Sequence, residues 1–279
     1  MSFLRLRSRP AQAAPVSRHS SARELGLRTR LGAIAWAAVA LMSCSMQRVE
    51  RTPLSSALPW SEARQLVLVT TPDWNASQGT LRTFARDGDR WHAVGAAAPI
   101  VIGRTGAAWG LGLHPAQPGL QKQEGDGRSP AGVFTIGTAF GYAASEPTAL
   151  PYEALGVDEY CVDVAGSPFY NRIIDAAKAG NAAVAGSTEP MRRDLHENGD
   201  EAYKIGFVIE HNPRGVAGAG SCIFAHLWKT PQTATAGCTA MTEAAMRDLL
   251  GWLKADAHPV FVLLPQVEYQ RLRAPWQLP

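Results

Sequence analysis

The segment that ends at Cys238 holds residues whose types and spacing suit nucleophilic catalysis. A short apolar run ends in His226, and a loop rich in Pro, Thr and Gln leads to Thr-Ala-Gly-Cys238. The nucleophilic form of cysteine is the thiolate, which a free thiol with a pKa of about 8.5 forms only to a few per cent at neutral pH. An imidazole that accepts the thiol proton overcomes this limit. We therefore predict Cys238 as the nucleophile and His226 as its general base.

The residues next to the cysteine suit the stabilisation of an oxyanion. Gly237 has no side chain, so a substrate carbonyl and backbone donors can come close to the sulfur. We expect the N–H groups of Gly237 and Cys238 to bind the oxyanion. Thr235 either donates a hydrogen bond to the substrate or holds the loop, and the sequence leaves both roles open.

Two segments of the chain resemble the L,D-transpeptidase catalytic domain family (YkuD-type). That family carries a histidine, a variable loop and Ser/Thr-x-Gly-Cys, and the matching residues here are His226, Thr235, Gly237 and Cys238. The upstream segment Gly-Asp-Gly-Arg-Ser-Pro-Ala-Gly-Val-Phe, residues 125–134, is similar to a second segment of many members. The resemblance extends over roughly residues 66–264, which is a typical size for one domain.

The resemblance implies a mainly β fold, a β-sandwich or barrel-like catalytic domain with a few short helices. It also implies that Cys238 attacks the carbonyl that joins a diamino acid to terminal D-alanine in a peptidoglycan stem peptide. An amine of a neighbouring stem then resolves the thioacyl-enzyme and forms a 3→3 crosslink. In the family a backbone carbonyl orients the histidine, and the chemistry requires no cofactor and no metal.

One residue departs from the family pattern. Many members have Arg or Asn two residues after the cysteine, where this chain has Ala240. Water as the resolving nucleophile would make the protein an L,D-carboxypeptidase or a crosslink hydrolase. A wall-binding module without catalytic activity is the alternative from another class, and it predicts an unreactive Cys238.

Two further residues are candidates for substrate binding. Arg128 could bind a substrate carboxylate, although the preceding Asp-Gly pair is a strong turn signal and is typical of a solvated turn arginine. His211 could line the cleft, or it could begin the Asn-Pro turn that follows it.

Three cysteines follow Cys44, and an odd number in an exported protein suggests one disulfide and one free thiol. If Cys238 is catalytic, Cys161 and Cys222 are the natural pair, but two buried reduced cysteines are equally compatible with the sequence. A zinc site formed by the three cysteines and His226 is a weak alternative, because the close Cys-x2-Cys pairs of most zinc sites are missing.

The first 43 residues have the features of a secretion signal. Their seven arginines are accompanied by one acidic residue, and an apolar run at 31–42 is too short for a membrane span of about 20 residues. The sequence that ends at Cys44 resembles a bacterial lipobox, with a plain signal peptide or an uncleaved anchor as the alternative. We expect an exported protein in the periplasm or cell envelope, lipid-anchored at Cys44, with a linker at 44–60 and the catalytic domain at 61–279.

The charge of the chain comes mostly from this leader. The whole chain has 27 basic and 24 acidic residues, a net charge of +3, and removal of residues 1–43 leaves 20 basic and 23 acidic residues. The remaining net charge of −3 gives no electrostatic basis for binding nucleic acid.

Short apolar runs separated by Gly and Pro predict mostly strands. The expected strands are 65–70, 80–85, 90–94, 99–102, 133–136, 160–164, 204–209, 222–228 and 260–264. Helices are expected at 171–178 and at 242–254, the second with Thr242 as its N-cap. The N-terminus of the second helix, close to Cys238, would favour a thiolate if the chain turns back there.

Overall fold

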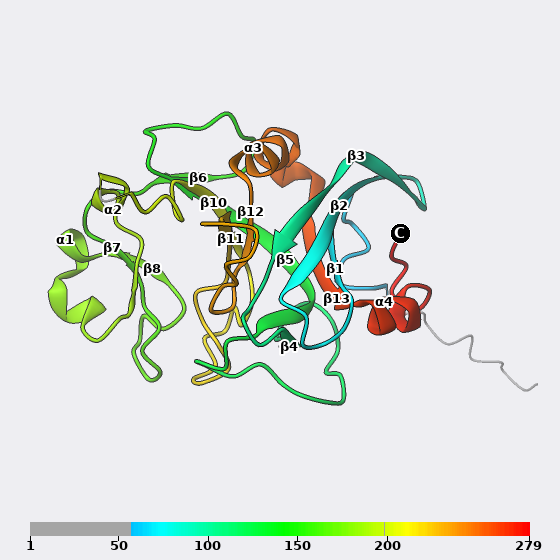
Figure 1. The fold of residues 1–279 in the computed structure, drawn as a ribbon, viewed down its shortest axis with the longest axis horizontal. Coiled ribbons are helices and arrows are strands. Elements are labelled where there is room, and N and C mark those ends of the chain that lie inside the picture. The colour runs from blue at the N-terminus through cyan, green and yellow to red at the C-terminus, as the bar shows by residue number, and fades with distance from the viewer. Residues whose placement is uncertain (1–56, 198) are drawn as a thin grey trace, which may run out of the picture. The chain divides into compact units, whose positions relative to one another are not determined.

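The computed structural model of the protein describes residues 57–197 and 199–279, and these residues form two β-sheets with short helices (Figure 1). They belong to the compact unit Ser55–Pro279. The expected signal segment, the lipobox and Cys44 lie outside the described residues. Trp60, the last residue of the expected linker, belongs to the folded domain, because its ring is buried and its indole N–H donates to Trp276 O at 3.1 Å.

The large sheet closes into a barrel-like ring. Its strands follow the order β10-β11-β12-β3-β2-β1-β13-β5-β4, and an additional pairing of β10 with β5 closes the ring, with β4 and β6 attached to β5 outside it. The mainly β, barrel-like fold expected from the sequence is confirmed. The strands are β1 (Gln65–Thr71), β2 (Gln78–Asp87), β3 (Arg90–Val101), β4 (Ala107–Trp109), β5 (Ser129–Gly141), β6 (Tyr152–Ala154), β10 (Ile205–Ile209), β11 (Phe224–Leu227), β12 (Thr239–Met241) and β13 (Val260–Pro265).

The core of this sheet lies around β1 and β13, which pair in parallel. Residues 66–69 of β1 and all of β13 are buried, as expected for strands covered on both faces. The expected β2–β3 hairpin is confirmed, and Gly88 in its turn has a φ of +53° that favours glycine.

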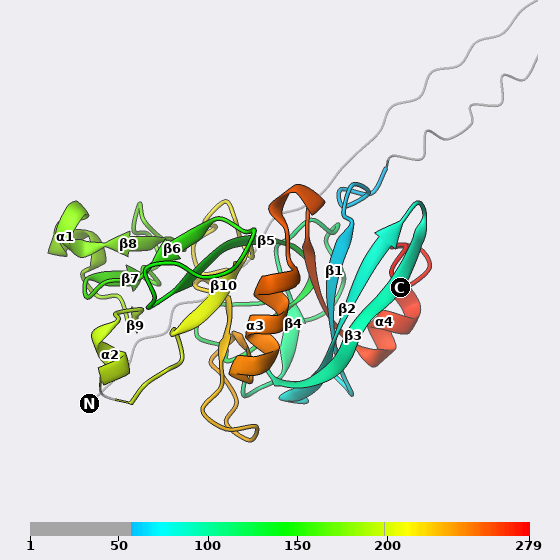
Figure 2. The same cartoon turned by 90° about the horizontal axis from the view of Figure 1, so that it is seen from above.

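The small sheet contains β7 (Glu159–Cys161), β8 (Ile173–Asp175) and β9 (Glu189–Pro190) in the order β8-β7-β9. It lies at one end of the domain, and the β2–β3 hairpin lies at the other end (Figures 1 and 2). The prediction of a helix at 171–178 was wrong. The segment begins with β8, and only α1 (Ala176–Ala179) is helical, because Asp175 caps it by accepting from the backbone of Ala177 and Lys178.

The helix expected at 242–254 is confirmed as α3 (Glu243–Trp252), and the Thr242 hydroxyl accepts from Ala245 N. Figure 2 shows α3 beside β10, and α4 lies near β1 and β13. Within the described residues, no helix is both long and apolar enough to cross a membrane. The remaining helices are α2 (Asp194–Glu197), α4 (Gln266–Leu272) and the short 3-10 turns Asn181–Val184 and Ala255–Ala257.

Candidate active site

Two neighbouring parallel strands place Cys238 and His226 in the same part of the large sheet. His226 lies in β11 opposite Ala240 of β12, and Cys238 directly precedes β12. The sulfur of Cys238 accepts a hydrogen bond from Phe224 N at 3.3 Å, and its thiol donates to Cys222 O at 3.4 Å. These two contacts to the chain before and within β11 hold the thiol in place, and Cys238 is 7% exposed.

The hydrogen bonding of His226 determines which ring nitrogen can act as a base. Its Nδ1 lies 2.8 Å from Leu227 O, and because a carbonyl only accepts, Nδ1 carries the proton. The lone pair is then on Nε2, which has no hydrogen-bond partner among residues 57–197 and 199–279. The ring of Tyr203 packs edge-on against the imidazole at 5.4 Å between centroids. His226 is therefore fixed in the tautomer that a general base requires.

Burial keeps both groups neutral at rest. Desolvation raises the pKa of the Cys238 thiol, the negative charge of Glu189 adds to this, and the Phe224 N–H opposes it. Desolvation lowers the pKa of the His226 imidazole, although its bond to Leu227 O partly offsets the effect. These directions favour a neutral thiol beside a neutral imidazole, so the proton moves when the thiol attacks. In the chain, β12 lies between Cys238 and the N-terminus of α3, and the effect expected of that terminus on the thiolate stays a prediction.

A cavity of about 220 Å³ opens beside the two residues. Its lining combines Glu189, from β9 of the small sheet, with residues of β11 and β12. The lining residues include the expected pair and Thr235, together with Ala240, which occupies the position of the family's Arg or Asn. The full set is Glu189, Ala202, Tyr203, His226, Leu227, Trp228, Lys229, Thr233, Ala234, Thr235, Ala236, Cys238 and Ala240.

Two hydroxyl groups brace the turn that carries the thiol. Thr235 Oγ1 donates to Cys238 O at 2.6 Å and accepts from Gly237 N at 3.1 Å. Ser129 Oγ, buried at the start of β5, donates to Gly237 O at 2.6 Å. Of the two roles open for Thr235, the structure shows loop support. The Gly237 N–H, expected in the oxyanion hole, donates to Thr235, whereas Cys238 N has no backbone partner within the described residues.

Arg128 and His211 make hydrogen bonds away from the cavity. The Arg128 guanidinium donates to Trp74 O at 3.2 Å and Ala107 O at 2.9 Å, and neither residue is part of the cavity lining. His211 accepts from Leu111 N at 3.2 Å through Nδ1, so its Nε2 carries the proton and donates to Ala219 O at 2.9 Å. Burial lowers the pKa of His211 to about 4. Through these hydrogen bonds both side chains connect loop segments, and their contacts with a substrate stay a prediction.

Cys161 and Cys222 form a disulfide with 5.9 Å between their Cα atoms, and Cys238 is a free thiol. The disulfide connects β7 of the small sheet to the chain that leads into β11. Since both sulfurs are bonded to each other, they cannot act as thiolate ligands. The zinc site considered from the sequence thereby loses two of its four donors.

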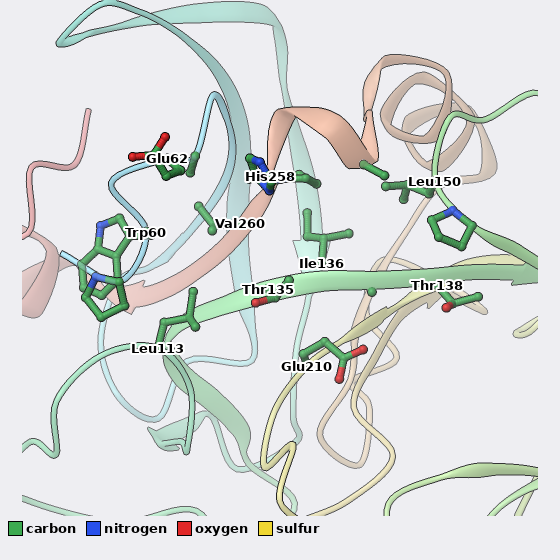
Figure 3. A pocket seen from close by; sticks show the side chains of 16 residues that line it. Trp60, Glu62, Leu113, Thr135, Ile136, Thr138, Leu150, Glu210, His258 and Val260 are labelled. Carbon is green, nitrogen blue, oxygen red and sulfur yellow. The ribbon is translucent and has the colours of Figure 1, made fainter. Parts of the chain in front are cut away.

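A larger pocket, of about 450 Å³, lies on another part of the domain (Figure 3). Its side chains come from β5, from β13 and from the segments before β1 and after β10. Glu62, Glu210 and His258 are its ionisable residues, and burial raises the pKa of the Glu210 carboxyl. The lining contains no cysteine and no serine. It therefore has no counterpart of the paired thiol and imidazole.

A comparison with known families assigns the chain to one of them. The family model described as the L,D-transpeptidase catalytic domain (YkuD) matches residues 73–262, which include β2 through the first half of β13 and both His226 and Cys238. The chain belongs to this family. The resemblance drawn from the two sequence motifs is confirmed at the level of the family. Members of this family are L,D-transpeptidases, which act on peptidoglycan peptides.

Comparison with individual proteins adds little to the family assignment. No curated protein gives a significant match. Among solved structures, this L,D-transpeptidase-family chain is similar to the Bdellovibrio bacteriovorus protein Bd1075, with 12% identity and a TM-score of 0.36. The alignment covers 77% of this chain and 54% of that protein, so the chain spans about half the length of the structure that it matches.

Three residues of the site could not be recognised as site residues from the sequence. Ser129 belongs to the upstream motif, and its hydrogen bond to Gly237 O connects that motif to the turn that carries Cys238. Tyr203 and Glu189 come from segments without a distinctive pattern. Their hydroxyl and carboxylate meet in the cavity, where Tyr203 donates to Glu189 Oε1.

Proposed function

We propose that the protein is a cysteine acyltransferase that acts on peptidoglycan stem peptides. The supporting observation is that His226 Nε2, with its lone pair free, lines the same cavity as the Cys238 thiol. Family membership supplies the substrate class, because L,D-transpeptidases act on these peptides.

In the first half-reaction His226 Nε2 takes the thiol proton as the sulfur attacks the carbonyl between the diamino acid and D-alanine. The Cys238 N–H stabilises the oxyanion. The imidazolium then protonates the leaving nitrogen, the C–N bond breaks, and D-alanine departs. A thioester to Cys238 and a neutral His226 remain.

In the second half-reaction an amine of a neighbouring stem attacks the thioester. His226 takes the proton that the amine loses, the C–S bond breaks, and the thiol is restored. The product is a 3→3 crosslink. If water attacks instead, the product is a shortened stem and the protein is a carboxypeptidase or hydrolase. The cavity residue Ala240, small and apolar, offers no hydrogen bond to the peptide at this position.

We further propose that the domain works outside the cytoplasm, lipid-anchored at Cys44. The Cys161–Cys222 disulfide supports this, because disulfides persist in oxidising compartments and are rare in the cytosol. Expression in a bacterial host followed by labelling with a radioactive fatty acid tests the anchor. Label in the wild-type protein and none in Cys44→Ala is the expected result.

Incubation of the purified protein with tetrapeptide muropeptides, followed by mass spectrometry, tests the activity. We expect release of D-alanine together with crosslinked dimers, and neither product with Cys238→Ala. Tripeptide monomers without dimers would indicate the carboxypeptidase. Unchanged muropeptides at all protein concentrations would contradict catalysis on this substrate and favour the wall-binding module.

A further inference from the structure

The cavity contains a second polar group that the reaction above does not use. Glu189, in β9 of the small sheet, lines the cavity with Cys238 and His226. The Tyr203 hydroxyl donates to its Oε1, and the same tyrosine ring packs against the imidazole of His226. Glu189 Oε2 has no hydrogen-bond partner among the described residues. The carboxylate is thus held at one oxygen and can bind a ligand through the other.

Within the part of the chain that the structure describes, this carboxylate has no cationic side chain as a partner. No lysine, arginine or histidine within the described ranges forms an ion pair with Glu189, and Lys229, which also lines the cavity, pairs with Asp200 at 3.9 Å. Desolvation raises the pKa of Glu189, as expected for a partly buried carboxylate without a counter-ion. A ligand that brings a positive charge would compensate this cost.

The position of Glu189 suits the second half-reaction better than the first. Its negative charge raises the pKa of the Cys238 thiol, so it opposes formation of the thiolate that begins acylation. Once the sulfur is acylated, that repulsion is gone, and the charge is available to attract a cation. The group that must then reach the sulfur is the acceptor amine, which is protonated in solution because amines of this kind have a pKa near about 10.

The size of the cavity agrees with a single amine-bearing side chain. At about 220 Å³ it is smaller than the pockets of about 300–1,000 Å³ that enclose drug-sized ligands. One aliphatic arm that ends in an ammonium group fits within this volume, and the rest of the stem would lie outside it. The apolar part of the lining, including Leu227 and Ala240, suits the methylene groups of such an arm.

We propose that Glu189 is the specificity residue for the acceptor: it binds the primary ammonium group of the incoming stem and places its nitrogen beside the thioester on Cys238. This inference rests on the proposed acyl transfer. His226, neutral after D-alanine has left, takes one proton from the ammonium group, which frees the lone pair for attack on the thioester. The second proton that the nitrogen loses passes to the sulfur as the C–S bond breaks, and the imidazolium then releases its proton to solvent. Glu189 remains ionised throughout, and Tyr203 acts as a positioning residue that orients the carboxylate.

The experiment measures the two half-reactions separately. Wild type and Glu189→Gln are mixed with a tetrapeptide donor whose free amines are acetylated, and the thioester on Cys238 is followed by intact mass after acid quench. A lysine-containing acceptor peptide is then added. Glu210→Gln is the matched control, because it removes a carboxylate of raised pKa from the pocket in Figure 3.

We expect Glu189→Gln to form the thioester at a rate within about threefold of wild type and to transfer it to the amine about 10- to 100-fold more slowly, as for loss of a charge-assisted hydrogen bond. The thioester should then resolve mostly with water. Tyr203→Phe, which keeps the carboxylate, should show a smaller and equally amine-specific loss. Glu210→Gln should match wild type in both steps.

Equal transfer to the amine by Glu189→Gln and wild type would overturn the inference. A loss of thioester formation as large as the loss of transfer would also overturn it, since Glu189 would then support the thiol and not the acceptor. Wild-type protein that never forms a thioester would refute the proposed function itself, and the inference with it.

Discussion

The cavity beside Cys238 and the pocket drawn in Figure 3 differ in which reactive side chains line them. The pocket is about twice as large, about 450 against 220 Å³, and contains Glu62, Glu210 and His258. The smaller cavity places a thiol that two backbone groups hold beside an imidazole whose base nitrogen has no internal partner among the described residues. Catalysis requires a nucleophile together with a base, and the volume of a pocket does not indicate whether it contains such a pair.

The largest expected difference between the two regions comes from removing the nucleophile. Cys238→Ala should lower release of D-alanine from tetrapeptide by on the order of 10⁴-fold or more, because the cavity lining contains no other thiol among the described residues. Glu210→Gln, in the pocket of Figure 3, should change the rate less than about threefold. A comparable loss in both variants would contradict the assignment of the active site to the smaller cavity.

Removing the base should have the next largest effect. His226→Ala should lower acylation by about 10²- to 10⁴-fold, the usual contribution of general acid–base catalysis. Single-turnover release of D-alanine measures this rate. His258→Asn is the control, because it removes a histidine from the other pocket and Asn tolerates the left-handed backbone found there, where φ is +48°. Equal rates for the two variants would remove His226 from the mechanism.

The protonation state at rest can be tested by alkylation. Burial raises the pKa of the Cys238 thiol, so the thiol is protonated at neutral pH and its thiolate fraction increases about tenfold per pH unit. Between pH 6 and 8 the rate of iodoacetamide labelling at Cys238 should therefore increase about 100-fold. A rate that is constant over this range would show a thiolate–imidazolium pair at rest.

A smaller effect is expected from the brace of the cysteine turn. Thr235→Val keeps the shape of the side chain but removes the hydroxyl that bonds Cys238 O and Gly237 N. Each of the two hydrogen bonds lost is worth about 1 kcal/mol, so the loss corresponds to about 5- to 30-fold in rate if it acts on the transition state. The KM for tetrapeptide and kcat, measured separately, should show the loss in kcat. A change in KM alone would instead support a substrate contact of Thr235.

The smallest expected effect is on stability, in the pocket of Figure 3. Burial raises the pKa of Glu210, so the folded state favours its protonated form and ionisation at neutral pH costs stability. Glu210→Gln should increase the free energy of unfolding by about 0.5–1 kcal/mol at pH 7. This gain should vanish as the pH falls below the pKa of the unfolded chain, about 4.3. Urea unfolding at pH 7 and pH 4 measures it, and a loss of stability at pH 7 would show an unrecognised partner for the carboxylate.

The sequence could predict those elements whose structure is determined by residues close together in the chain. The buried run of β1, the Asp-Gly turn of the β2–β3 hairpin and the Thr242 cap each depend on residues close in the chain. The 171–178 segment was assigned incorrectly because its strand pairs with distant β7, and tertiary pairing prevailed over local helix propensity.

The site shows the same division between local and distant causes. Cys238 and His226 are 12 residues apart, and His226 lies in β11 while Cys238 directly precedes the adjacent strand β12, so the motif predicts their proximity. The Ser129 brace joins residues 108 positions apart, and Glu189 reaches the cavity only because the small sheet folds against β11. No local pattern encodes such contacts. The disulfide, left open by the sequence, likewise depends on the distance between Cα atoms of residues 61 positions apart.

The measurement that tests the central claim most directly is intact-protein mass spectrometry of the wild-type protein, quenched in acid during turnover of a tetrapeptide donor. We predict an adduct with the mass of the donor minus D-alanine, located at Cys238 by peptide mapping, and absent from Cys238→Ala. Release of D-alanine without any adduct on Cys238, or an adduct that persists in Cys238→Ala, would contradict the account.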